Sequence, residues 1–222
     1  MRLIGVYLSP FVRRVAVSLN LLNLPFEHED VFVFGEPETV RRYNPLVRIP
    51  VLATDDGEYL VESGAILDEI DHHPAVETPL TPRAGPQRRR VLQTCALAMG
   101  SAEKAQWAFY EDRVRPAEKV HAPWIAHNDG QVLGGFERLN DIAALTAGEG
   151  WMAGTATLSQ ADVTTSVAFT FAALARPGLA LAERFPELAR LAARCEDLPA
   201  FIAAPVPAGP KLERLLARPF VQ

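Results

Sequence analysis

The sequence has few cysteines and no long apolar run. Its 222 residues include two cysteines, Cys95 and Cys195, which lie far apart and form neither a C-x-x-C motif nor a metal-binding spacing. We expect both to be small core residues in a reducing compartment. No apolar stretch approaches the length of a membrane span, and the first residues lack the pattern of a signal peptide. These absences predict a cytoplasmic protein without a membrane partner.

The chain also has no surplus of basic residues. It contains 22 lysines and arginines against 27 aspartates and glutamates, so the formal net charge is −5. Nucleic-acid-binding domains usually carry a basic footprint. The five histidines, including the adjacent His72 and His73, have no ligand spacing. We therefore expect neither a nucleic-acid partner nor a bound metal. The length permits one large domain or two small ones.

Strand-like and helical patterns alternate in the first third of the chain. Apolar residues recur at helical spacing from Phe11 and stop before Pro25. The turn sequence Asp55-Asp56-Gly57 separates two short β-type runs, and Ser63 is a candidate N-cap for a helix that ends before Pro74. The predicted elements are a strand at 2–8, a helix from 11, a strand at 26–32, at most one short helix within 35–46, strands at 50–54 and 58–61, and a helix from 63.

A cluster of prolines separates this part from an all-helical remainder. Pro74, Pro79, Pro82 and Pro86 interrupt regular structure. Helical patterns follow at about 86–115, 123–146, 160–175, 180–195 and 208–217, and Ser159 with Asp162 predicts a capping box. We predict an α/β plus all-α fold: a βαβαββα domain at 1–76, a linker at 77–85 and an all-α domain at 86–222.

The dipeptide Ile49-Pro50 lies at the start of a predicted strand. A proline there donates no ladder hydrogen bond, so it leaves the backbone N–H and C=O of Ile49 free for a ligand. We expect a cis peptide bond, which costs little only before proline. Upstream lies Ser9, at the end of the first predicted strand, and downstream lies Glu62-Ser63, at the start of a predicted helix.

These three motifs, in this order and spacing, resemble the soluble, cytosolic-type glutathione S-transferases, in a bacterial-like form with a Ser-type active site. The similarity continues through Trp151 to Gly154 and Leu158 to Asp162, and it fades over about the last twenty residues. The resemblance implies a thioredoxin-like N-terminal domain, glutathione as co-substrate and a homodimer. It also implies that the all-α domain forms the pocket for a hydrophobic electrophilic small molecule.

Each part of glutathione suggests a partner among these residues. The backbone of Ile49, held by Pro50, would pair with the cysteinyl unit as an added strand. The start of the helix at Ser63 suits the γ-glutamyl carboxylate, and Glu62 would take the ammonium group. Arg48 would reach the glycyl carboxylate. Each residue also has a purely structural alternative: an N-cap for Ser63, a first-turn carboxylate for Glu62 and a solvated charge for Arg48.

Ser9 is the predicted catalytic residue. A hydroxyl that donates to sulfur favours the thiolate over the thiol, and the positive end of the following helix acts in the same direction. Alternatively, Ser9 only caps that helix, with Pro10 at its first position. Tyr7, predicted to lie within the strand, is the rival donor. Of Arg13 and Arg14, we expect one to support the site from beneath and the other to face water.

The sequence thus predicts a glutathione transferase in which Ser9 stabilises the thiolate for attack on the electrophile. A glutathione-dependent isomerase or peroxidase would use the same site. A non-catalytic binding or assembly module that kept the fold is the alternative from another class, because fold alone does not fix function.

Overall fold

The computed structural model describes residues 1–146 and 150–217. The described residues divide into two compact units, one formed by Met1–Leu80 with Pro199–Leu212 and the other by residues 81–198 with residues 213–217. Residues 199–212, which the sequence-based division assigns to the all-α domain, therefore pack within the first unit. The units are described separately below.

The first unit is built on a four-stranded sheet in the order β2-β1-β3-β4. β1 runs parallel to β2, whereas β3 runs antiparallel to both β1 and β4. The predicted βαβαββα order is confirmed. Its elements are β1 (Arg2–Ile4), α1 (Pro10–Leu21), β2 (Glu27–Glu29), α2 (Pro37–Arg41), β3 (Val51–Ala53), β4 (Tyr59–Val61) and α3 (Ser63–Asp71).

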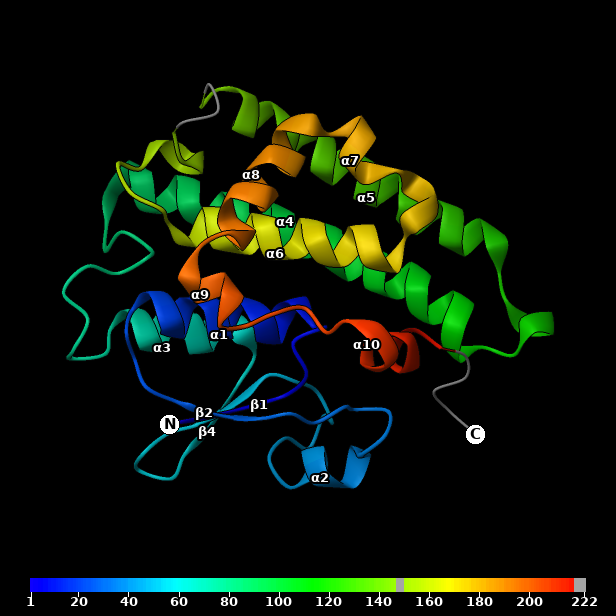
Figure 1. Ribbon diagram of the computed structural model, residues 1–222, viewed down its shortest axis with the longest axis horizontal. Coiled ribbons are helices and arrows are strands. Elements are labelled where there is room, and N and C mark those ends of the chain that lie inside the picture. Colours follow the sequence, from blue (N-terminus) through cyan, green and yellow to red (C-terminus); the bar gives the residue numbers. More distant parts are fainter. Residues whose placement is uncertain (147–149, 218–222) are drawn as a thin grey trace. The chain divides into compact units, whose positions relative to one another are not determined.

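Side chains alternate between the two faces of this sheet, as strand geometry requires. Leu3 and Leu52 pair directly and point to one face, whereas their neighbours Ile4 and Val51 point to the other. On that second face, Ile4 and Val51 form a buried cluster with Val40 of α2. Helices α1 and α3 contact each other on the opposite face (Figure 1). The sheet is therefore covered by helices on both sides.

The first two strands are shorter than predicted. β1 ends at Ile4 because Gly5 adopts a φ of +134°, which turns the chain. Tyr7 and Leu8 consequently lie in a turn, so the prediction that Tyr7 belongs to the strand was wrong. β2 covers only Glu27–Glu29, within the predicted 26–32.

The chain returns to the first unit after α8. Helix α9 (Pro199–Ile202) lies against α1. The buried Arg13 donates from Nε to the carbonyl oxygen of Ala204 at 2.8 Å, and its guanidinium lies 5.6 Å from the centroid of the Phe201 ring. Farther along, Lys211 forms an ion pair with Asp30. These contacts attach the segment 199–212 to α1 and to the end of β2.

The second unit is a helical bundle in which α4 packs against α5 and α6, and α8 packs against α5 and α6. The predicted single helix at 180–195 is split at Phe185, because Pro186 starts a new helix and cannot continue the preceding one. The remaining helices are α4 (Gly85–Val114), η1 (Ala117–Lys119), α5 (Ala122–Ala144), η2 (Met152–Gly154), α6 (Gln160–Ala175), η3 (Pro177–Leu179), α7 (Leu181–Arg184), α8 (Pro186–Glu196) and α10 (Gly209–Leu216), the last spanning both units.

The predicted capping box begins α6. The buried Asp162 carboxylate accepts hydrogen bonds from the N–H of Ser159 at 2.9 Å, from the Ser159 hydroxyl at 2.8 Å and from the N–H of Met152 at 2.7 Å. The last bond also joins the helix to η2, and burial raises the pKa of Asp162. Cys95 and Cys195 are both buried, as predicted.

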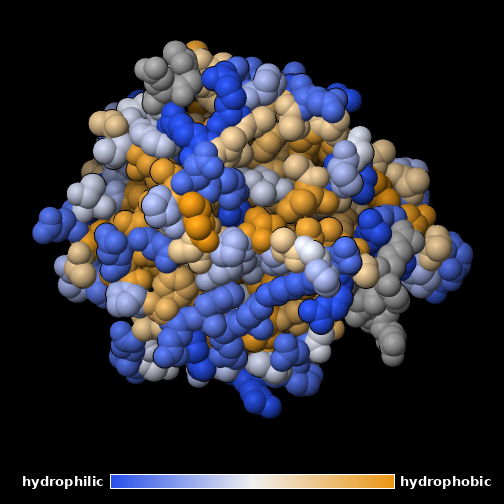
Figure 2. Space-filling model, viewed as in Figure 1, coloured by the Kyte–Doolittle hydropathy of each residue, from blue (hydrophilic) through white to orange (hydrophobic). Residues whose placement is uncertain are grey.

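Hydrophilic and apolar residues are mixed on the face shown in Figure 2, which is usual for folded proteins. Within the described part of the chain, no single helix is long and apolar enough to cross a membrane. One pair, Gln160–Ala175 with Pro177–Arg184, meets that test of length and composition together but is bent by 101°.

Candidate functional site

The register of the sheet brings the three predicted motifs to one end of it. Ile4, the last residue of β1, pairs with Val51, the first residue of β3, and Val51 also pairs with Val61, the last residue of β4. The segment after Ile4, the segment before Val51 and the segment after Val61 therefore leave the sheet side by side. They carry, in chain order, Ser9, Ile49 with Pro50, and Glu62 with Ser63.

Ser9 occupies the N-cap position of α1, but its side chain does not cap the helix. The backbone of Ser9 is held on both sides: its N–H donates to the carbonyl oxygen of Val6 at 3.0 Å, and its own carbonyl accepts from the N–H of Arg13 at 2.9 Å. The half-buried hydroxyl has no hydrogen-bond partner among the described residues. It is thus an available donor at the positive end of a helix.

Tyr7 is held differently. Its ring stacks on His28, with centroids 3.8 Å apart and an interplanar angle of 5°. Burial, together with the charge of Asp30, raises the pKa of Tyr7 to about 12. The Tyr7 ring is therefore held against β2, the strand to which His28 belongs.

The Ile49–Pro50 peptide bond is cis, as the sequence predicts. Pro50 is buried and immediately precedes β3. The Ile49 side chain packs against the cluster around Ile4, whereas its backbone N–H and C=O make no hydrogen bond within residues 1–146 and 150–217. The described part of the chain therefore leaves the N–H and C=O of Ile49 without a hydrogen-bond partner, as the sequence predicts.

The approach to Ile49 is shaped by a residue whose role the sequence did not reveal. The buried Asn44 donates from Nδ2 to the carbonyl oxygen of Arg48 at 2.9 Å and accepts at Oδ1 from the N–H of Leu46 at 3.0 Å. Val47, at the tip of this loop, has a φ of +52°, a region that favours glycine. The Arg48 side chain is exposed and has no ion-pair partner in the described residues.

At the start of α3, Glu62 is the N-cap, and Ser63 is the first helical residue. The prediction that Ser63 caps the helix was therefore wrong. Glu62 has a φ of +72°, which turns its carboxylate toward the helix, where Oε2 accepts from the N–H of Gly64 at 2.9 Å. The other oxygen, Oε1, lies 3.2 Å from the Ser63 hydroxyl, which donates to it.

The two arginines of α1 are both buried, with relative exposures of 2% for Arg13 and 6% for Arg14. The prediction that one of them faces water was wrong. Arg13 binds the returning segment at Ala204. Arg14 reaches Ser63, donating to its Oγ from Nη2 at 2.7 Å and from Nε at 3.2 Å. No local pattern signals this contact, because the two residues are 49 positions apart.

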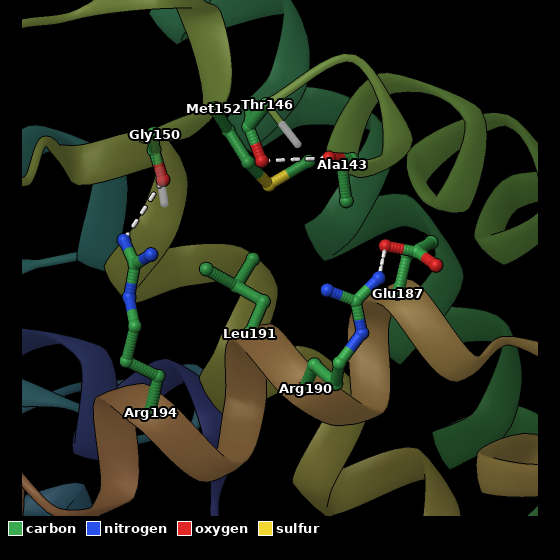
Figure 3. A pocket seen from close by; sticks show the side chains of 8 residues that line it. All are labelled: Ala143, Thr146, Gly150, Met152, Glu187, Arg190, Leu191 and Arg194. Atoms are coloured by element: carbon green, nitrogen blue, oxygen red, sulfur yellow. Dashed lines mark hydrogen bonds and ion pairs between the residues drawn. The ribbon is translucent and has the colours of Figure 1, made fainter. Parts of the chain in front are cut away.

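The second unit contains a cavity of about 20 Å³ next to α8, far too small for a tripeptide (Figure 3). Its cationic side chains are engaged: Arg190 pairs with Glu187, and Arg194 donates to the carbonyl oxygen of Gly150 at 2.8 Å. Among the described residues, no three histidine, cysteine, aspartate or glutamate side chains form a group that could hold a metal ion.

Residues 3–79 match the family model for the N-terminal domain of glutathione S-transferases. The chain is 32% identical to the uncharacterized GST-like protein YibF of Escherichia coli over 117 residues, which is 53% of this chain and 57% of that protein. It is 28% identical to maleylacetoacetate isomerase of Pseudomonas aeruginosa, covering 63% of this chain and 69% of the isomerase. The chain thus spans little more than half of the first relative's length, and 31% of the length of a glutathione S-transferase U1 from Arabidopsis thaliana.

Solved structures match over nearly the whole chain. A glutathione S-transferase from Methylobacterium radiotolerans, in complex with glutathione sulfonate, is 29% identical with a TM-score of 0.83, covering 94% of this chain and 95% of that one. A glutathione S-transferase from Methylobacillus flagellatus with bound glutathione is 27% identical with a TM-score of 0.82, covering 91% of this chain and 98% of that one. The likeness includes both the thioredoxin-like unit and the helical unit. The first unit therefore matches the N-terminal domain of the glutathione S-transferases, and the chain as a whole is similar to solved members of that family.

Proposed function

We propose that this protein is a glutathione transferase in which Ser9 stabilises the glutathione thiolate for attack on a hydrophobic electrophile. The observation that carries the proposal is the set of groups at one end of the sheet: a hydroxyl without a partner in the described chain, an unpaired backbone edge and a helix start. The relatives with bound glutathione or glutathione sulfonate support the choice of ligand.

Glutathione binding uses groups that the fold leaves available. The cysteinyl peptide unit pairs with the backbone of Ile49, beside the buried Pro50. The γ-glutamyl carboxylate lies at the first turn of α3, at Ser63, and Glu62 accepts from the ammonium group. The exposed Arg48 contacts the glycyl carboxylate. No general base is required among these residues, because their task is to bind the ligand and to favour its thiolate.

The chemical step follows from the pKa of the thiol. A free thiol has a pKa of about 8.5, so only a small fraction is ionised at neutral pH. A hydrogen bond from the Ser9 hydroxyl and the positive end of α1 both favour the thiolate, so the thiol releases its proton to water. The sulfur then forms a bond to the electrophilic carbon, and the leaving group departs with its electron pair.

The test compares Ser9→Ala with Tyr7→Phe, since each removes one candidate hydroxyl. We expect Ser9→Ala to raise the thiol pKa of bound glutathione, followed by thiolate absorbance, and to lower kcat with an activated aryl halide by roughly a hundredfold. Tyr7→Phe should change neither quantity. The reverse pattern would make Tyr7 the thiolate partner. Binding of glutathione without turnover of any electrophile would indicate a binding module.

A glutathione-dependent isomerase is the second candidate, and the likeness to maleylacetoacetate isomerase favours it. In that reaction the thiolate adds to the substrate and leaves again, so glutathione is not consumed. A peroxidase would instead oxidise glutathione with a hydroperoxide. Mass spectrometry of glutathione after turnover separates the three reactions, because it detects a conjugate, unchanged glutathione or the disulfide.

We also propose that the protein is a cytoplasmic homodimer. The proposal rests on the family and on a cysteine content that suits a reducing compartment. Light scattering coupled to size-exclusion chromatography should give twice the chain mass of 24.3 kDa. A mass of one chain at micromolar concentration would contradict the dimer.

A further inference from the structure

A fourth segment leaves the sheet at the end that carries the proposed site. Ile4, the last residue of β1, pairs with Glu29, the last residue of the parallel strand β2, so Asp30 leaves the sheet beside the segment that follows Ile4. The proposed contacts to glutathione come from segments next to β1, β3 and β4, whereas β2 lies on the other side of β1. An electrophile that meets the thiol at Ser9 must therefore approach from the side that glutathione leaves uncovered, which is the side of β2.

Tyr7, two residues before Ser9, joins the turn after β1 to this side. Its ring stacks on His28 of β2, and Nε2 of His28 lies 2.7 Å from the carbonyl oxygen of Gly5. Burial raises the pKa of the Tyr7 phenol, and the negative charge of Asp30 acts in the same direction. The Asp30 carboxylate therefore lies close to the turn that carries Ser9.

Lys211 brings a positive charge to this side of the site. It belongs to the returning segment 199–212, which packs within the first unit, and it forms an ion pair with Asp30. Both side chains reach solvent, with relative exposures of 45% for Lys211 and 40% for Asp30. An ammonium group has three donors, and an ion pair this exposed contributes little to stability. A carboxylate on a ligand can therefore pair with Lys211, either beside Asp30 or in its place.

We propose that Lys211 is a specificity-determining residue that selects electrophiles carrying a carboxylate. This inference rests on the proposed glutathione transferase function, and it names the class of electrophile that the site prefers. The substrate carboxylate pairs with the Lys211 ammonium group while the electrophilic carbon meets the thiolate at Ser9. Asp30 has the opposite effect, because it holds Lys211 when no substrate is bound and its own charge repels an anion.

The experiment compares two activated aryl halides of nearly the same shape and different charge, 4-chloro-3-nitrobenzoate and 4-chloro-3-nitrobenzamide. In each, the glutathione sulfur bonds to the ring carbon that carries chlorine, and chloride leaves with the electron pair. The measured quantity is the ratio of kcat/KM for the benzoate to kcat/KM for the benzamide. Changes in glutathione binding or in the thiolate affect both substrates, so they cancel in this ratio.

The two members of the ion pair should shift the ratio in opposite directions. We expect Lys211→Gln to lower it about tenfold, since a charge-assisted hydrogen bond to the substrate is lost. Asp30→Asn should raise it about threefold, since the competing carboxylate is removed. Both substitutions break the same ion pair. If that pair only attached the returning segment to β2, the two variants would therefore shift the ratio in the same direction or leave it unchanged.

Arg214→Gln is the matched control. Arg214 is exposed and lies on the same helix as Lys211, about one turn farther along. Its substitution removes one positive charge, as Lys211→Gln does, but leaves the ion pair of Lys211 with Asp30 in place. We expect Arg214→Gln to leave the ratio unchanged. An equal fall in both variants would refute selection by Lys211, because a general attraction of anions by the helix would then explain the effect.

The outcomes separate this inference from the function beneath it. If the unsubstituted protein turns over neither electrophile, the proposed transferase function and this inference both fall. If it turns over both, and Lys211→Gln leaves the ratio unchanged or Asp30→Asn lowers it, only the role of Lys211 is refuted. Circular dichroism of each variant checks that the exposed substitutions leave the fold intact.

Discussion

Gly5→Ala tests whether the end of β1 and the Ile49 backbone are held against each other. Gly5 has a φ of +134°, a conformation that side chains rarely adopt. A Cβ placed there would lie 2.7 Å from Cγ2 of Val12 and 2.9 Å from Cβ of Ile49. Because Cβ of Ile49 is fixed to its backbone, the added methyl group cannot be accommodated by a side-chain rotation. Either β1 or the Ile49–Pro50 segment must move.

Two costs add in this variant. The backbone strain of a non-glycine residue in such a conformation is about 1–3 kcal/mol, and overpacking a tight site adds about 1–3 kcal/mol. Gly57→Ala isolates the first cost, because Gly57 also has a positive φ, +91°, but nothing lies within 4 Å of its added Cβ. We therefore expect Gly5→Ala to lower the free energy of unfolding by about 1–3 kcal/mol more than Gly57→Ala does.

Urea denaturation of the two variants measures this difference, and calorimetry measures the affinity for glutathione. Gly5→Ala should weaken glutathione binding, because the displaced Ile49 backbone no longer presents its N–H and C=O in the same place. Gly57→Ala, in the β3–β4 turn, should leave binding unchanged. Equal destabilisation by both substitutions would refute the packing argument, and unaltered binding in Gly5→Ala would refute the link to the site.

Two further predictions concern the helical unit. Asp162→Ala should lower the free energy of unfolding by about 2–4 kcal/mol in urea, because it leaves the buried N–H groups of Ser159 and Met152 without their acceptor; a similar loss in the exposed Asp141→Ala would contradict this account. The pKa of the Cys195 thiol is raised from 9.0 to about 12, mainly because the thiol is buried, and the negative charge of Asp162 acts in the same direction. Iodoacetamide at pH 8 should therefore label Cys195 only in denaturant, and the stability that this thiol contributes should be complete below about pH 9 and decline toward pH 12. Rapid labelling of the folded protein would show that Cys195 is not buried as described.

The order of elements in the first unit follows from the sequence because each signal is local. The Asp55-Asp56-Gly57 turn, the helical spacing after Phe11 and the proline before β3 each act within a few residues. The cis peptide bond at Pro50 was also predicted, because only an X-Pro bond adopts that form readily. These features need no knowledge of distant contacts.

The features that the sequence did not reveal depend on distant contacts. Arg13 and Arg14 are adjacent charged residues, so local pattern placed one of them in water, yet Ala204 and Ser63 accept from them inside the unit. The close approach of Ile49 to Gly5, which leaves no room for a Cβ at that position, also joins residues far apart in the sequence. The N-cap is Glu62, whereas the sequence predicts Ser63. Glu62 has a positive φ, which residue propensity does not predict for a glutamate.

The return of residues 199–212 to the first unit bears on how such proteins exchange parts during evolution. The segment that matches the family model, residues 3–79, is not self-contained, since Arg13 inside α1 binds a carbonyl group contributed by Ala204. A chimera that joins this N-terminal segment to the helical part of a relative would bring a foreign chain to that guanidinium. Recombination at the proline-rich linker alone therefore separates Arg13 from the residues that it binds. A chimera that keeps these contacts must carry the stretch around Phe201 and Ala204 together with α1.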